Sequence, residues 1–129
     1  MAKYVFGRTV EMDVAQAREA VTQALAKEGF GVLSEIDVAA TLKKKLGLER
    51  PAYLILGACN PQFAAQALEA EPQIGALLPC NVVVRAGDGG KTVVEFMDPD
   101  VMLGLVDAAG IAPIAAEVKA RLTRVMNAL

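Results

Sequence analysis

Two cysteine–asparagine pairs, Cys59-Asn60 and Cys80-Asn81, contain both cysteines of this 129-residue chain. The first pair closes an apolar run that is typical of a strand, and the second pair opens another such run. Thiols and amides together support two kinds of chemistry, which are reversible thiol redox reactions and small-molecule binding through amide hydrogen bonds. These four residues form the candidate site if the fold brings the two strand ends together.

Cys59 lies immediately before a predicted helix, because Asn60-Pro61 combines a preferred N-cap residue with proline at the first helical position. The partial positive charge of a helix N-terminus favours a thiolate and would lower the pKa of Cys59. It also favours a small anionic ligand, to which the Asn60 amide can donate. If the two strands are neighbours, Cys80 can act as the resolving partner of Cys59. The alternative is that both cysteines are small buried hydrophobic residues without chemistry.

Two further polar residues enter the predicted site. Asn81 follows Cys80 into a strand, where asparagine is disfavoured, so we expect it to bridge structural groups or to contact a ligand. Glu35 lies on another predicted strand and becomes a candidate acid or base only if its face lines a pocket. The predicted ligand-binding residues are therefore Cys59, Asn60, Cys80, Asn81 and Glu35, with Cys59 and Cys80 as candidate catalytic thiols.

The composition excludes several classes of function. Histidine is absent, which excludes His-based catalytic triads and imidazole metal ligands. Two thiolates alone do not complete a four-ligand zinc site, and their spacing does not fit a zinc ribbon, so we expect neither a metal nor a cofactor. The net charge of -2 lacks the basic field of a nucleic-acid-binding protein.

The sequence also predicts where the protein resides. The first ten residues contain no continuous apolar core of a signal peptide, and no apolar run reaches the length that spans a bilayer. We therefore expect a cytoplasmic protein without a membrane partner, in which both cysteines rest as thiols.

Hydrophobic periodicity and capping residues predict the elements that position the candidate site. Asp13 with Gln16 forms a capping-box pattern at the start of the first helix, and Gly29 ends that helix. The expected strands are 4–10, 30–38, 52–58, 80–85 and 91–97, and the expected helices are 14–28, 39–46, 61–71, 99–109 and 113–129.

In two of these strands, the residue pattern also predicts how the two faces of the sheet are used. A period of two in 30–38 places Phe30, Val32, Ser34, Ile36 and Val38 on one face, and Leu33, Glu35 and Asp37 on the other. Apolar and polar residues do not alternate in the strand 52–58. This favours a strand that is covered on both faces, and a second subunit could provide one of these covers.

This order of elements, which ends in a hairpin and two helices, argues against a doubly wound parallel sheet. We predict that residues 1–129 form a single α+β domain. Its architecture is a two-layer sandwich with a mostly antiparallel sheet and helices on one face.

Several segments together resemble the family known as domain of unknown function 302. They are residues 29–38, 42–47, 53–61 (with Gly-Ala-Cys-Asn-Pro), 67–75 and 77–84 (with Leu-Pro-Cys-Asn). The resemblance covers nearly the whole chain. It departs from the family pattern at Ala52-Tyr53, where an Arg-Pro-Tyr-like order is more usual.

The resemblance implies a curved antiparallel sheet backed by helices, similar to the TATA-binding-protein-like fold, and a homodimer. It implies neither DNA binding nor an activity, since fold and function separate readily. Three hypotheses follow: a homodimeric small-ligand-binding module at the Cys-Asn pairs, a thiol redox or sulfur-handling protein, and a purely structural interaction domain. The sequence does not decide whether the protein is an enzyme.

Overall fold

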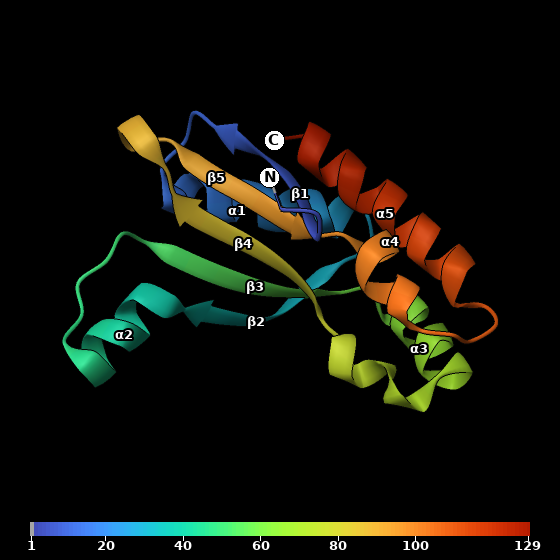
Figure 1. Cartoon of the computed structure of the whole chain (residues 1–129). Helices are drawn as coiled ribbons and strands as arrows, with labels where there is room; N and C mark the ends of the chain where they lie inside the picture. Colours follow the sequence, from blue (N-terminus) through green and yellow to red (C-terminus); the bar gives the residue numbers. More distant parts are fainter. Residues whose placement is uncertain (1) are drawn as a thin grey trace.

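The computed structural model describes residues 2–129 as one antiparallel sheet with helices packed mainly on one of its faces (Figure 1). The strands are β1 (Val5–Val10), β2 (Gly31–Asp37), β3 (Tyr53–Cys59), β4 (Cys80–Ala86) and β5 (Thr92–Met97). The α-helices are α1 (Val14–Lys27), α2 (Val38–Leu46), α3 (Pro61–Ala70), α4 (Pro99–Met102) and α5 (Ile111–Asn127). Short 3-10 helices are η1 (Pro72–Leu77), η2 (Asp88–Gly90) and η3 (Leu103–Leu105).

The sheet has the strand order β1-β5-β4-β3-β2, and all four neighbouring pairs are antiparallel. Helices α1 and α5 cover one face, whereas α2 and α3 lie at opposite ends of β2 and β3 (Figure 1). The predicted α+β class, antiparallel sheet and helical layer are confirmed.

Local capping explains where the helices begin. Asp13 accepts a hydrogen bond from the backbone N–H of Gln16 at 2.8 Å, and the Gln16 side chain accepts one from the N–H of Asp13 at 3.1 Å. This is the capping box that the sequence predicts. The last helix differs from the prediction, because it begins at Ile111 rather than at Pro113. Proline fits there because the first turn of a helix requires no N–H donor.

The predicted alternation of the second strand is wrong beyond Val32. A register shift between Val32 and Ser34 leaves Leu33 without a partner on β3, which is the arrangement of a β-bulge. Ser34 and Ile36 consequently lie on the face opposite to Val32. The bulge moves every later side chain of β2 to the other face, which no count of alternating residues anticipates.

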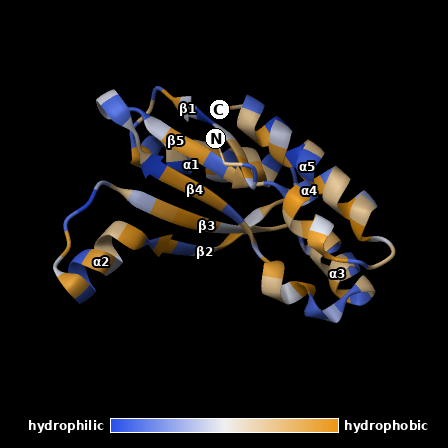
Figure 2. Cartoon of the chain, in the orientation of Figure 1, coloured by the Kyte–Doolittle hydropathy of each residue, from blue (hydrophilic) through white to orange (hydrophobic). Residues whose placement is uncertain are grey.

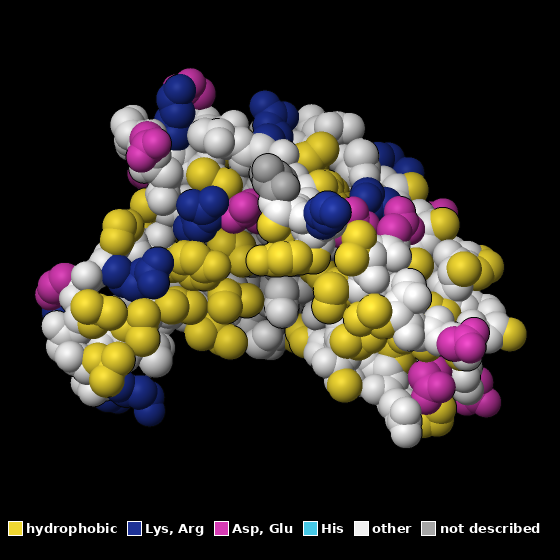
Figure 3. Space-filling model, viewed as in Figure 1, with side chains coloured by type: hydrophobic (Ala, Val, Ile, Leu, Met, Phe, Trp, Pro, Cys, Tyr) yellow, Lys and Arg dark blue, Asp and Glu magenta, His cyan; other side chains and the backbone are white. Residues whose placement is uncertain are grey.

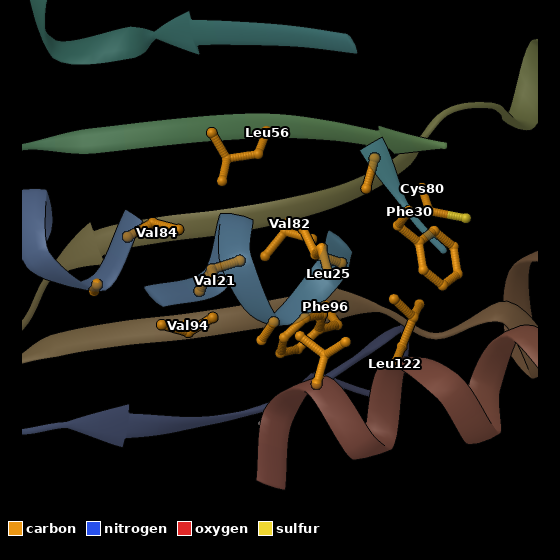
Figure 4. Close-up of a cluster of buried hydrophobic side chains, with 14 of the residues drawn as sticks. Val21, Leu25, Phe30, Leu56, Cys80, Val82, Val84, Val94, Phe96 and Leu122 are labelled. Atoms are coloured by element: carbon orange, nitrogen blue, oxygen red, sulfur yellow. The ribbon is translucent and has the colours of Figure 1, made fainter. Parts of the chain in front are cut away.

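The hydrophobic core consists of two clusters that share α5. The larger one lies between the sheet and helices α1 and α5, and includes the fully buried Leu25, Leu56, Phe96 and Leu122 (Figure 4). The smaller cluster packs α3, η1 and η3 against the first turns of α5, and its buried members are Ala67, Ile74, Leu103, Ile111 and Ala115.

Within residues 2–129, no helix layer covers the opposite face of the sheet. The apolar middle of β3, orange in Figure 2, contributes side chains to both faces of the sheet. Leu54 and Leu56 belong to the helix-covered core, while Tyr53 and Ile55 are half-buried on the open face. A second subunit that covers the open face of β3 stays a prediction.

Candidate functional site

Asn60 lies at the junction between β3 and α3 and is 7% exposed. Its side-chain oxygen accepts hydrogen bonds from the backbone N–H groups of Gln62 at 3.1 Å and Phe63 at 3.2 Å. These two bonds cap α3, as the Asn-Pro pattern predicts. They also occupy two of the N–H groups that would otherwise bind an anion.

A clamp formed by Gly29 and Arg121 holds this junction against the end of α1 and the middle of α5. The Arg121 guanidinium donates to the backbone oxygen of Glu28 at 3.0 Å and to the carboxylate of Glu117 at 3.0 Å, and stacks over the Phe63 ring at 4.9 Å. Gly29 has a φ of 85°, and an added Cβ would lie 2.9 Å from the amide nitrogen of Asn60. Only glycine meets both the backbone conformation and the close approach.

A cavity of about 450 Å³ opens beside this clamp, between the end of the sheet and α3. This volume is typical of small-molecule sites. Its wall is almost entirely apolar and contains three of the predicted site residues, Cys59, Asn60 and Cys80. We call it the Cys-Asn pocket. Its remaining lining comes from Phe30, Leu33, Ser34, Ala58, Phe63, Ala64, Ala67, Leu68, Gly75, Leu78, Pro79, Leu103, Ile114 and Val118.

The two thiols differ in their surroundings. Cys80 is buried at the start of β4, whereas Cys59 is half-buried, and both are free. Burial, and secondarily the charge of Cys59, raise the pKa of the Cys80 thiol from its ordinary 9.0 to about 11. At neutral pH Cys80 is therefore protonated and a weak nucleophile. The register pairs Cys80 with Ala58 rather than with Cys59. The two cysteines are therefore not cross-strand partners, although both line the same cavity.

We predict that alkylation with iodoacetamide at neutral pH modifies Cys59 in the folded protein and leaves Cys80 unmodified until the pH approaches about 11. Peptide mass spectrometry over a series of pH values measures both reactions in one sample, and the urea-unfolded protein, in which both thiols react, is the control. Equal rates for the two cysteines in the folded state would contradict the protected position of Cys80.

The same shift has a consequence for stability. The folded-state pKa of Cys80 lies above its unfolded value, so its contribution to stability is complete below pH 9.0 and is lost as the pH rises toward about 11. The alkylation series should therefore be accompanied by circular dichroism, so that reaction of the native thiol is separated from unfolding.

Asn81 and Glu35 do not lie in the Cys-Asn pocket. Asn81 is exposed and lines a separate groove of about 310 Å³ on the open face of the sheet, together with Tyr4, Glu95 and Met97. Glu35 lies beside α1 and forms an ion pair with Arg18. The structure therefore joins Cys59, Asn60 and Cys80 and separates both other candidates from them.

Sequence reasoning missed most of the pocket wall and the whole clamp. Ala64 and Leu68 have the helical spacing of core residues, yet they face the cavity. Arg121 has the pattern of an exposed helix residue, and its contact with Glu28 joins positions 93 apart in the chain. Only Gly29 carries a local signal, since glycine at a helix end predicts a left-handed backbone.

No helix within residues 2–129 is both long and apolar enough to cross a membrane. No three metal-ligating side chains in this part of the chain come together in a cluster.

Comparisons with known proteins find the same family that the sequence motifs resemble. The model of the family described as "Domain of unknown function DUF302" matches residues 6–129. A crystal structure of an uncharacterized conserved protein DUF302 from Bacillus stearothermophilus is similar at a TM-score of 0.90 and 30% identity, over 98% of each chain. Comparison with the curated proteins gives no match. Since the family model spans almost the whole chain, this protein belongs to the DUF302 family.

Proposed function

We propose that the protein is a homodimeric module that binds a small, uncharged, mainly apolar molecule in the Cys-Asn pocket. The observation that carries this proposal is an apolar cavity of about 450 Å³ at the end of the sheet, with one buried amide in its wall. Binding sites commonly combine such an apolar lining with a few polar groups that orient the ligand.

The charges around the pocket favour an uncharged ligand over the anionic ligand that the sequence suggests. No lysine or arginine of the described chain lines the pocket. The nearby Arg121 is engaged with Glu28, Glu117 and the Phe63 ring. An anion would therefore lose its hydration without gaining a counter-charge. The amide nitrogen of Asn60 makes no hydrogen bond with residues 2–129, so it is available to a ligand oxygen.

The homodimer is supported by exposed apolar side chains that extend along β2 and onto α2 and the segment after it. Leu33 and Leu46 are 72% and 73% exposed, and Ile36 and Leu48 are each 50% exposed. Clustered apolar exposure of this kind marks interaction surfaces. A cytoplasmic location is part of the proposal, and it is supported by two cysteines that are free rather than paired.

We test ligand binding with two fluorescent probes of the same ring system, the neutral N-phenylnaphthylamine and the anionic anilinonaphthalenesulfonate. We predict that the neutral probe binds more tightly, and that Ala64→Phe weakens its binding about tenfold or more by filling the pocket. Ala65→Phe is the matched control, because Ala65 is exposed on the same helix and does not line the pocket.

Equal affinities for Ala64→Phe and Ala65→Phe would remove the pocket from the proposal. Tighter binding of the sulfonate that is lost in Ala64→Phe would replace the uncharged ligand by an anionic one.

Thiol redox or sulfur chemistry is the second candidate function, because both cysteines line one cavity. The raised pKa of Cys80 and its position opposite Ala58 weaken this candidate. The alkylation series described above separates the two, since a resolving cysteine must react near neutral pH.

A further inference from the structure

The helix α2 and the segment after it form an arm that projects beyond the β2 edge of the sheet (Figure 1). No residue of α2 is buried. The apolar Leu46, at the end of the helix, and Leu48, in the segment after it, are both exposed. An amphipathic helix normally covers its apolar side against another surface. The arm is also basic, because Lys43, Lys44 and Lys45 stand in succession and are exposed.

The other end of β2 carries an arm of opposite charge, formed by α3, η1 and η3. Glu69 and Asp107 are exposed there, and residues 61–79 contain no lysine or arginine. The Cys-Asn pocket opens at this end, and its lining includes the exposed leucines Leu33 and Leu68, which are 72% and 42% accessible. In Figure 3, lysine and arginine atoms lie on the α2 arm beside a single acidic group, and several acidic groups lie on the opposite arm, with a hollow between the two.

The β2 edge, with the basic arm at one end and the acidic arm at the other, forms a surface that is complementary to itself. β2 begins at Gly31 beside the pocket and ends at Asp37, directly before α2. A two-fold axis beside the middle of β2 exchanges these ends, so the basic arm of one copy meets the acidic arm of the other at two equivalent places. Such an isologous contact closes as a dimer and leaves no free end.

Resting on the proposed homodimer and its pocket, we infer that a second copy of the chain docks along the β2 edge and lays its α2 arm over the mouth of the Cys-Asn pocket. The partner subunit's Leu46 and the partner subunit's Leu48 then cover Leu33 and Leu68, and the ligand site is complete only in the dimer. Side chains form this contact rather than an added strand, because the bulge at Leu33 interrupts the β2 edge.

Paired charge reversals test the arrangement. Lys44→Glu/Lys45→Glu makes both arms acidic, and Glu69→Lys/Asp107→Lys makes both arms basic, so each pair should raise the dimer dissociation constant about tenfold at low salt. A chain with all four substitutions restores opposite charges and should recover the wild-type constant. Arg8→Glu/Lys91→Glu, two reversals of exposed residues on β1 and directly before β5, at the side of the sheet opposite β2, is the control. Sedimentation equilibrium measures the constants, and circular dichroism verifies folding.

The affinity of N-phenylnaphthylamine, measured across the same variants, should fall in step with the dimer fraction. Unchanged dissociation constants in both charge-reversed variants would overturn the inference and leave the homodimer in place. A monomeric wild type would remove the homodimer as well, with ligand binding still tested by Ala64→Phe. Equal probe affinity in monomer and dimer would show that the partner does not close the pocket, and would also overturn the inference.

Discussion

Gly7→Ala is expected to lower the free energy of unfolding by about 3 kcal/mol, the largest loss that we predict for a single methyl group. The added Cβ would lie 2.0 Å from the backbone oxygen of Val94 and 2.9 Å from the Cα of Glu95. A side chain could rotate away from such a contact, but the backbone of β5 cannot. β1 must therefore separate from β5, which also disturbs the stacking of Phe6 on Phe96 at 5.4 Å.

Urea unfolding followed by circular dichroism measures this loss, and Gly31→Ala provides the matched control. Gly31 also lies in an edge strand, but its Cβ would meet nothing within 4 Å. We expect Gly31→Ala to stay within about 0.5 kcal/mol of wild type. Similar values for both variants would show that β1 does not approach β5 as closely as described.

Asn60→Ala is expected to lower the free energy of unfolding by about 2 kcal/mol. The substitution leaves two N–H groups of α3, those of Gln62 and Phe63, without their acceptor at a position that is 7% exposed. Water cannot replace the lost acceptor as readily as at an exposed cap, so the loss should lie at the upper end of the range for N-cap residues.

Two further variants separate the cap from other effects. Asp37 caps the exposed helix α2 through a single bond to the N–H of Ala40 at 2.9 Å, so Asp37→Ala should cost less than Asn60→Ala. Asn60→Asp keeps an oxygen that can accept from the N–H groups of Gln62 and Phe63, so it should retain more stability than Asn60→Ala. Equal losses for Asn60→Ala and Asp37→Ala in urea unfolding would refute the special role of the buried cap.

The features that sequence alone predicts in this chain are those decided by residues a few positions apart. The capping pairs Asp13-Gln16 and Asn60-Pro61 act within one turn, and the hairpin around η2 needs only its glycines and two apolar runs. The α+β class follows from the order of these elements. The Cys-Asn pairs were informative for the same reason, since each marks a strand end.

What sequence reasoning missed depends on contacts between distant parts of the chain. The bulge at Leu33 is set by the match between β2 and β3, and periodicity within β2 does not contain that information. The pocket wall joins α3, the strand ends and α5, so Ala64 and Val118 have the same local pattern as core residues. Glu35 became a candidate through its charge, but its ion pair with Arg18 explains that charge without a ligand.

The division of the hydrophobic core into two clusters has a consequence for motion. The Cys-Asn pocket lies along their seam, with Phe30 and Cys80 from the larger cluster on one side and Ala67 and Leu103 from the smaller on the other. The smaller cluster has few buried members and contains no strand, so α3 and η1 form the region that opens locally before the sheet unfolds. We expect a molecule bound at the proposed site to join the two clusters and to oppose this local opening. Binding should then slow amide hydrogen exchange in α3 without a change of fold.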